Sequence, residues 1–160
     1  MAQIVISDAG PLIALAKIDH LFLLEQLFGC VLLPAAVQQE CLAKEGMDGE
    51  RIQQAIETGI LQVIAPAAEI AEVRLPRSLG EGEKAAIRLV LQQAHSLLIV
   101  DDQAARRQAA KLGLTFIGTV RLLDIAEKQG LLEDAEQTVL AIQRLGYRIS
   151  TDILRQIRQY

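Results

Sequence analysis

The feature that most constrains the fold is the alternation of short apolar runs with amphipathic segments. The apolar runs lie at 3–7, 30–33, 61–64, 97–100 and 115–117. Helical patterns fill the chain around them, at 12–16, 21–28, 34–44, 49–57, 82–94, 102–112, 119–129, 132–145 and 151–159. Short apolar runs of this kind are typical of strands that are buried on both faces. The alternation therefore predicts an α/β fold, with a parallel sheet covered by helices on both sides.

The length and composition fit a single domain with an aliphatic core. A chain of 160 residues has the size of an ordinary single domain. Its hydrophobic share is 51% but its aromatic share only 3%, so Leu, Ile, Val and Ala must build the core. Because no long linker or repeat divides the sequence, we expect a single domain over 1–160, with 131–160 as a C-terminal helical extension.

The sequence carries no sign of a membrane or secreted location. No stretch reaches the roughly 18 apolar residues that a membrane span needs. The start lacks basic residues, and Asp8 interrupts its apolar run, which argues against a signal peptide. Cys30 and Cys41 lack metal-type spacing and fit reduced thiols. We therefore predict a cytoplasmic protein with no membrane partner.

The charge is distributed unevenly along the chain. The net charge of −4 argues against a generally basic nucleic-acid binder. However, residues 1–105 carry 7 Lys and Arg against 14 Asp and Glu, whereas residues 106–160 carry 9 against 6. An acidic N-terminal part that holds metal and a basic C-terminal part that holds phosphate would produce this imbalance. Solvent-exposed surfaces with unequal numbers of acidic and basic residues would produce it as well.

Two acidic positions follow predicted strands directly. Ligands of parallel sheets bind beyond the carboxyl ends of the strands, which directs attention to Asp8 after 3–7 and to Asp101 and Asp102 after 97–100. Asp8 also fits a turn or helix cap, and Asp102 fits the N-cap of the next helix. We therefore favour Asp101 as the ligand at this position and keep Asp102 as the alternate.

Two further acids lie on predicted helices. Glu83 comes three residues before Ala86 and four before Ile87, so helical geometry places it on the inward face, whereas Glu81 belongs to the exposed set. A carboxylate on that face is costly unless it is paired, hydrated or bound to metal, although the nearby helix start relieves part of the cost. Glu40 lies towards the apolar side of its helix, where an ordinary boundary position explains it equally well.

Taken together, these acids form a pattern that suits a divalent cation. Carboxylate oxygens are the ligands that Mg²⁺ and Mn²⁺ prefer. No cluster of His and Cys competes, because His20 and His95 are far apart and unaccompanied. The residues thus predict an acidic pocket that binds Mg²⁺ or Mn²⁺.

Four ordered stretches carry a family resemblance. They are residues 4–15, 33–40, 82–87 and 98–106, and the Gly118-Thr119 helix start extends the likeness over about 3–130. In these stretches the chain resembles the PIN-domain nucleases, most closely a bacterial subgroup of predicted PIN proteins long catalogued as a domain of unknown function. The ordered set is more specific than any one stretch.

The resemblance implies a fold, a site and an activity. The fold would be a PIN-like three-layer α/β/α arrangement with a central parallel sheet of four to five strands. The activity would be Mg²⁺- or Mn²⁺-dependent endonuclease action, usually on RNA and often as the toxin of a toxin–antitoxin pair, with an antitoxin protein as partner. Carried over by position, the catalytic acids are Asp8, Glu40, Glu83 and Asp101, the metal ligands come from Asp8, Glu83, Asp101 and Asp102, and Thr119 is an auxiliary polar residue.

Basic residues near the last strand-end acids could steer the RNA backbone. Arg106, Arg107 and Lys111 are the candidates, although solvated helix residues of this kind are common.

The last helical segments contain apolar residues spaced among arginines. Core packing is the default interpretation of this pattern; a homodimer face or an antitoxin-binding face is the alternative, and we expect the protein to form a homodimer. The apolar residues are Ile142, Leu145, Ile149, Ile153, Leu154 and Ile157.

Two other functional classes compete with the nuclease. The first is a non-catalytic PIN-like module that binds RNA or a partner protein. A phospho-acceptor signalling domain fits poorly, because such domains group two acids after the first strand, where this chain has only Asp8.

Overall fold

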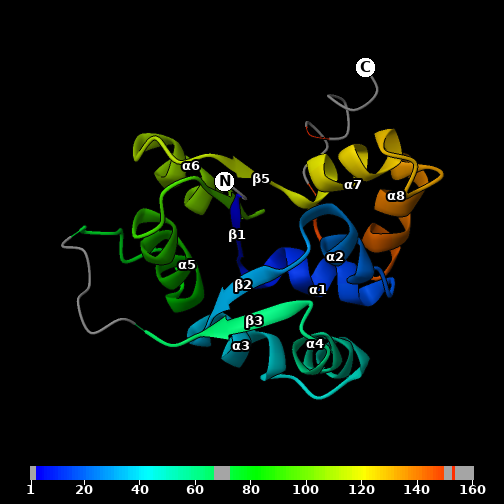
Figure 1. The fold of residues 1–160 in the computed structure, drawn as a ribbon, viewed down its shortest axis with the longest axis horizontal. Helices are drawn as coiled ribbons and strands as arrows, with labels where there is room; N and C mark the ends of the chain where they lie inside the picture. Colours follow the sequence, from blue (N-terminus) through cyan, green and yellow to red (C-terminus); the bar gives the residue numbers. More distant parts are fainter. Residues whose placement is uncertain (1–2, 67–72, 150–152, 154–160) are drawn as a thin grey trace.

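The described part of the chain folds around a five-stranded sheet. The computed structural model describes residues 3–66, 73–149 and 153 (Figure 1). The strands are parallel and lie side by side in the order β3 (Leu61–Ile64), β2 (Val31–Pro34), β1 (Ile4–Ser7), β4 (Ser96–Ile99) and β5 (Phe116–Ile117). The predicted α/β fold with a parallel sheet is confirmed.

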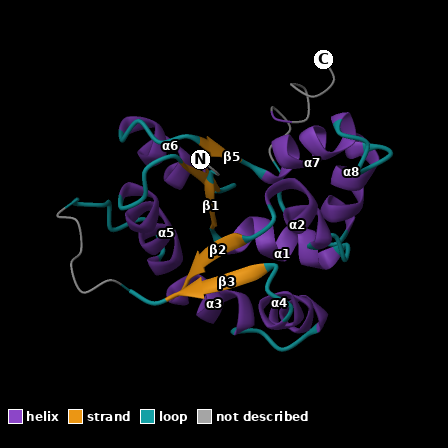
Figure 2. Ribbon diagram, viewed as in Figure 1, coloured by secondary structure: helices purple, strands orange, loops and turns teal. Residues whose placement is uncertain are grey.

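Helices cover both faces of the sheet (Figure 2). They are α1 (Ala9–Lys17), α2 (Phe22–Phe28), α3 (Ala35–Leu42), α4 (Met47–Glu57), α5 (Glu81–Leu91), α6 (Gln103–Lys111), α7 (Thr119–Lys128) and α8 (Ala135–Arg144). Alternate strand residues enter two apolar clusters, with Val5 in one and Ile6 in the other. The first cluster packs against α1 to α4, α7 and α8, and the second against α5 and α6. The three layers thus follow from the period of two along each strand.

Several helix ends differ from the predicted ones. Helix α1 begins at Ala9, so that Pro11 falls in its first turn, where a missing N–H costs nothing. Helix α5 ends at Leu91 rather than 94, and His95 beyond it has a left-handed backbone with φ of 56°. The helix predicted at 151–159 lies outside the described residues except for residue 153.

The strand order creates a crevice at the carboxyl ends of β1 and β4. From β1 the chain builds outward to β2 and β3, and then crosses back to place β4 on the other side of β1. Ser7 is in register with Ile99, and the Asp8 N–H donates to the Ile99 carbonyl at 2.9 Å. Such a reversal of strand order leaves an opening that ligands use. Asp8 and the residues after β4 therefore meet at this opening.

The cysteines, the helix lengths and the C-terminal apolar residues test further predictions from the sequence. Cys30 and Cys41 are free thiols. No helix among the described residues is long and apolar enough to span a membrane. Core packing is confirmed for Ile142, which is fully buried, while Leu145 is 53% exposed. Ile149 and Ile153 pack partly against the core, and Leu154 and Ile157 lie outside the described residues.

Candidate active site

Asp8 is the most deeply buried acid of the predicted set. It follows β1 and precedes α1, and only 5% of it is exposed. Its Oδ1 is buried without a hydrogen-bond partner among the described residues. Burial raises the pKa of Asp8 to about 7; the backbone hydrogen bond with Ala9 lowers it, while the charges of Glu83, Glu40 and Asp101 raise it further. The other three acids predicted from the sequence therefore lie close enough for their negative charges to raise the pKa of Asp8.

Gly82, at the start of α5, brings Glu40 and Asp8 close together. A Cβ built on this glycine would lie 2.6 Å from Glu40 Oε2 and 3.6 Å from Asp8 Oδ1. The two carboxylates therefore converge on the same stretch of bare backbone. Glu40 is exposed as a whole, so its prediction as a boundary residue of α3 also fits what is observed.

Glu83 lies beside the other predicted acids and also caps the start of its own helix. It is half-buried, and its Oε2 accepts a hydrogen bond from the Gly80 N–H at 3.0 Å, which caps the start of α5. Burial raises its pKa, the Gly80 hydrogen bond lowers it, and the charges of Asp102 and Glu40 raise it. The residue thus combines a capping role with a place beside the other acids. Glu81 is exposed, as predicted, with 85% of its side chain accessible.

Asp101 is held by three donors. Its Oδ1 accepts the Thr119 N–H at 2.7 Å, and its Oδ2 accepts the Thr119 hydroxyl at 2.6 Å. The Tyr147 hydroxyl also donates to Oδ2. Thr119, the predicted auxiliary residue, is therefore in direct contact with an acid of the set, at the start of α7.

Asp102 takes the capping role that the sequence suggested for it. Its Oδ2 accepts the Ala105 N–H at 2.9 Å, and the side chain caps α6. Asp102 is exposed while Asp101 is half-buried, so the geometry favours Asp101 over its neighbour as the acid of the pocket.

Tyr147 is a site residue that sequence reasoning missed. It lies after α8, and its phenolic oxygen reaches both Asp101 and α1, where a Cβ built on Gly10 would come within 3.0 Å of it. Burial, followed by the nearby Asp101 charge, raises the pKa of Tyr147 far above its usual value. One signal was available, because a glycine inside an otherwise Ala-rich helix indicates a close approach by another group.

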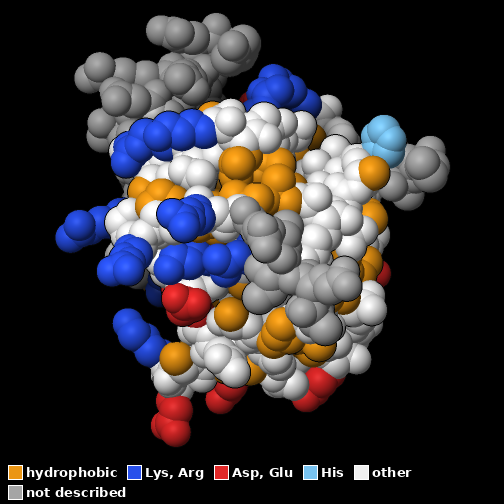
Figure 3. All heavy atoms as spheres, turned by 90° about the vertical axis from the view of Figure 1, so that its left-hand side faces the viewer, with side chains coloured by type: hydrophobic (Ala, Val, Ile, Leu, Met, Phe, Trp, Pro, Cys, Tyr) orange, Lys and Arg blue, Asp and Glu red, His pale blue; other side chains and the backbone are white. Residues whose placement is uncertain are grey.

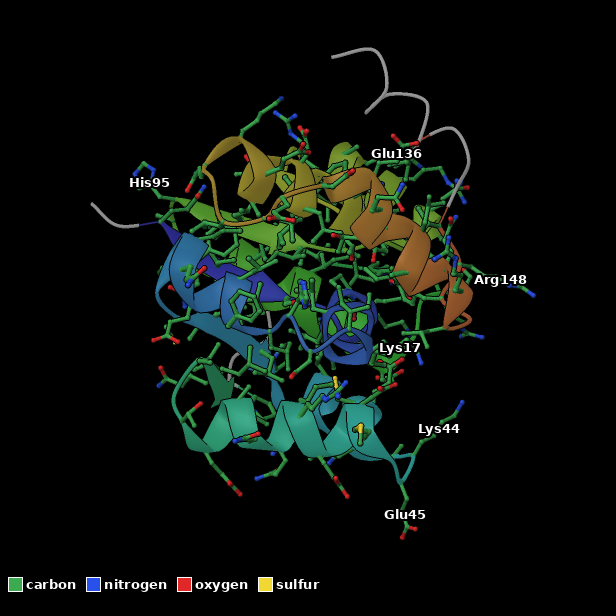
Figure 4. All side chains as sticks on the ribbon, turned by 90° about the vertical axis from the view of Figure 1, so that its right-hand side faces the viewer. Lys17, Lys44, Glu45, His95, Glu136 and Arg148 are labelled. Atoms are coloured by element: carbon green, nitrogen blue, oxygen red, sulfur yellow. The ribbon has the colours of Figure 1, made fainter. Side chains whose placement is uncertain are left out.

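A basic cleft adjoins Asp101. It has a volume of about 450 Å³ and is lined by Arg106, Arg121 and Arg148 as well as Asp101. Arg106 stacks over the Phe116 ring at 5.3 Å, and Arg148 projects outward from the molecule (Figure 4). Sequence reasoning named Arg106 but missed Arg121 and Arg148, which come from α7 and the segment after α8.

The other predicted basic residues lie on α6 outside this cleft. Arg107 and Lys111 are exposed. The face of the molecule that carries α5 and α6 shows Lys and Arg side chains gathered over one half (Figure 3).

The acidic set fits a divalent cation by its chemistry. As they stand, no three His, Cys, Asp or Glu side chains in the described ranges form a ready metal cage. Within the described part of the chain, the buried Asp8 Oδ1 has no hydrogen-bond partner, and the carboxylates around it repel one another. Hard oxygen donors in such a group suit Mg²⁺ or Mn²⁺.

The comparisons with known proteins agree with this geometry. No curated protein matches the chain. Residues 4–160 match the family described as PIN domain, which spans almost the whole sequence. With the five-stranded parallel sheet and the acids at its carboxyl edge, this match shows that the chain belongs to the PIN-domain family.

Proposed function

We propose that the protein is a metal-dependent endoribonuclease that hydrolyses RNA phosphodiester bonds. PIN domains are generally of nuclease type and typically bind divalent metals. The observation that carries the proposal is the buried, unpartnered Oδ1 of Asp8 at the crevice between β1 and β4, beside Glu40, Glu83 and Asp101. A purely structural role does not explain a costly buried oxygen that accepts no hydrogen bond from residues 3–66, 73–149 or 153.

Each acid would have its own role in metal binding or in hydrolysis. Asp8 and Asp101 would hold Mg²⁺ or Mn²⁺, with Glu83 assisting directly or through water. The ion would supply Lewis-acid stabilisation of charge on the phosphate and make nearby water more acidic. Glu40, the most exposed acid of the catalytic set, would orient the attacking water. Thr119 keeps Asp101 in place through its two hydrogen bonds.

The basic cleft would take the RNA backbone beside the acids. Its three guanidinium groups offset the repulsion between the acidic pocket and phosphate. Arg107 and Lys111 extend this positive charge along α6. Phe116 lies under Arg106, and the chain has few aromatics otherwise, so we expect little base stacking and weak sequence preference.

The test is cleavage of a structured RNA in Mn²⁺, Mg²⁺ or EDTA. We expect wild type to cleave with metal only, and Asp8→Asn and Glu83→Gln to lose at least about 100-fold in rate, the scale of a lost charge-stabilising group. Glu81→Gln is the matched control, because Glu81 lies on the same helix turn but is exposed. Equal cleavage by wild type and Asp8→Asn, or no cleavage with either metal, would refute the proposal.

Two observations favour a second candidate, a PIN-like module that binds RNA without cutting it. The described acids form no ready metal cage, and Asp101 already accepts three hydrogen bonds. RNA binding that needs the cleft arginines but is indifferent to EDTA and to Asp8→Asn would support this candidate.

Toxin–antitoxin membership is a further part of the proposal. Leu145 is an exposed apolar side chain between Arg144 and the cleft residue Arg148, a combination that suits an acidic, amphipathic antitoxin segment or a second copy of this chain. Co-expression with a small protein encoded by a neighbouring gene, followed by measurement of the mass in solution, distinguishes an antitoxin complex from a homodimer. A monomer with no co-purifying partner would contradict both.

A further inference from the structure

Tyr147 reaches the acidic group from a part of the chain that follows the sheet and most of the helices. The residue lies beyond α8, after Gly146, whose φ of 93° lets the chain turn back towards the crevice. The Tyr147 ring packs partly against the core, and its hydroxyl donates to Asp101 Oδ2. The last described segment thereby contributes a group to a site otherwise built from strand ends, helix starts and the last turn of α3.

The hydrogen bonds on Asp101 limit how this carboxylate can bind anything else. Two carboxylate oxygens offer about four lone-pair sites. Thr119 and Tyr147 hydroxyls occupy both sites of Oδ2, and the Thr119 N–H occupies one of Oδ1. One lone pair on Oδ1 is left open among the contacts of the described residues. The carboxylate is thus fixed in rotation and offers a single acceptor site.

Gly10 makes room for this arrangement. A Cβ at this position would lie 3.0 Å from the Tyr147 oxygen, closer than such contacts normally come. Gly10 sits in the first turn of α1, two residues after Asp8, where alanine would favour the helix by about 1 kcal/mol. The chain therefore has a glycine at the position where a side chain would press against the Tyr147 hydroxyl and shift it by a few tenths of an ångström.

We propose that Tyr147 is a positioning residue that orients Asp101 for a divalent cation, so that Asp101 binds through Oδ1 alone. The inference rests on the proposed metal-dependent function. Partners that orient a metal ligand without touching the metal typically change metal affinity by about 10- to 100-fold. Tyr147 acts through Asp101 and has no place in the cleavage step itself.

The test is isothermal titration with Mn²⁺, together with the rise in melting temperature that Mn²⁺ causes. We expect Tyr147→Phe to weaken Mn²⁺ binding by about 10-fold or more and to reduce the metal-induced shift in melting temperature. A merely structural tyrosine would lower the melting temperature with and without Mn²⁺ equally. Tyr160→Phe is the chemical control, since it removes the same hydroxyl from the other tyrosine of the chain.

A second variant tests the same inference with the phenol still present. Gly10→Ala in the otherwise wild-type chain should weaken Mn²⁺ binding, because its methyl shifts the Tyr147 hydroxyl relative to Asp101. The same change should have no further effect in Tyr147→Phe, which lacks that hydroxyl. Tight Mn²⁺ binding by wild type, Tyr147→Phe and Gly10→Ala alike would overturn the positioning role and leave the proposed function standing. Absence of Mn²⁺ and Mg²⁺ binding to wild type would overturn both.

Discussion

Replacing Asp8 with asparagine should stabilise the metal-free protein. The folded-state pKa is about 7 against an ordinary value of 3.8, so the fold prefers the protonated carboxyl. The stability that this protonated group provides is fully present below pH 3.8 and is lost as the pH rises through about 7. At 1.36 kcal/mol per pKa unit, ionisation of Asp8 costs roughly 4 kcal/mol at pH 8. Asparagine is neutral and nearly isosteric, so it avoids this cost.

The assay is urea unfolding in EDTA at pH 5 and pH 8, followed by circular dichroism. The stability advantage of Asp8→Asn over wild type should grow by about 3 kcal/mol between these two pH values. Asp19→Asn is the control, because Asp19 has an exposed side chain and a left-handed backbone that asparagine accepts. An advantage that is the same at both pH values, or a variant less stable than wild type at pH 8, would refute the reasoning.

Three further predictions concern the same acids. Mn²⁺ should raise the melting temperature of wild type, EDTA should reverse the rise, and Asp8→Asn should show neither effect. Thr119→Val should lower the free energy of unfolding by about 2 kcal/mol in urea titrations, because the buried Thr119 hydroxyl bonds to the Asp101 carboxylate. Asp102→Ala should cost about 1 kcal/mol through the lost cap of α6 and leave Mn²⁺ affinity within twofold of wild type; a larger loss of affinity would make Asp102 a ligand.

Much of the fold could be predicted because its signals are local. Short apolar runs between amphipathic helices predict buried parallel strands, and each of the five predicted runs forms a strand. Asp8 and Asp101 could be selected because they follow β1 and β4, and these strands turn out to be neighbours. The strand order itself comes from long-range packing, which a single sequence does not reveal.

The parts of the site that sequence reasoning missed come from irregular or distant segments. Tyr147 follows a turn after α8 and has no periodic pattern that relates it to Asp101. Arg121 and Arg148 resemble ordinary exposed helix and loop residues until the fold brings them to one cleft. Helical phase correctly separated Glu83 from Glu81, yet it could not show that the Gly80 N–H also binds the Glu83 carboxylate.

The pairing of β1 with β4 has a consequence for how the protein is made. Ile4 pairs with Ser96, and Asp101 takes its hydrogen bonds from Thr119 and Tyr147, so the acidic group joins the first residues of the chain to nearly the last described ones. On the ribosome, Asp8 emerges long before any of these partners exists, and contacts of such sequence separation form late. A growing chain therefore cannot bring Asp8 beside Asp101 before β4 has been made, and cannot complete the hydrogen bonds on Asp101 before Tyr147 has left the ribosome.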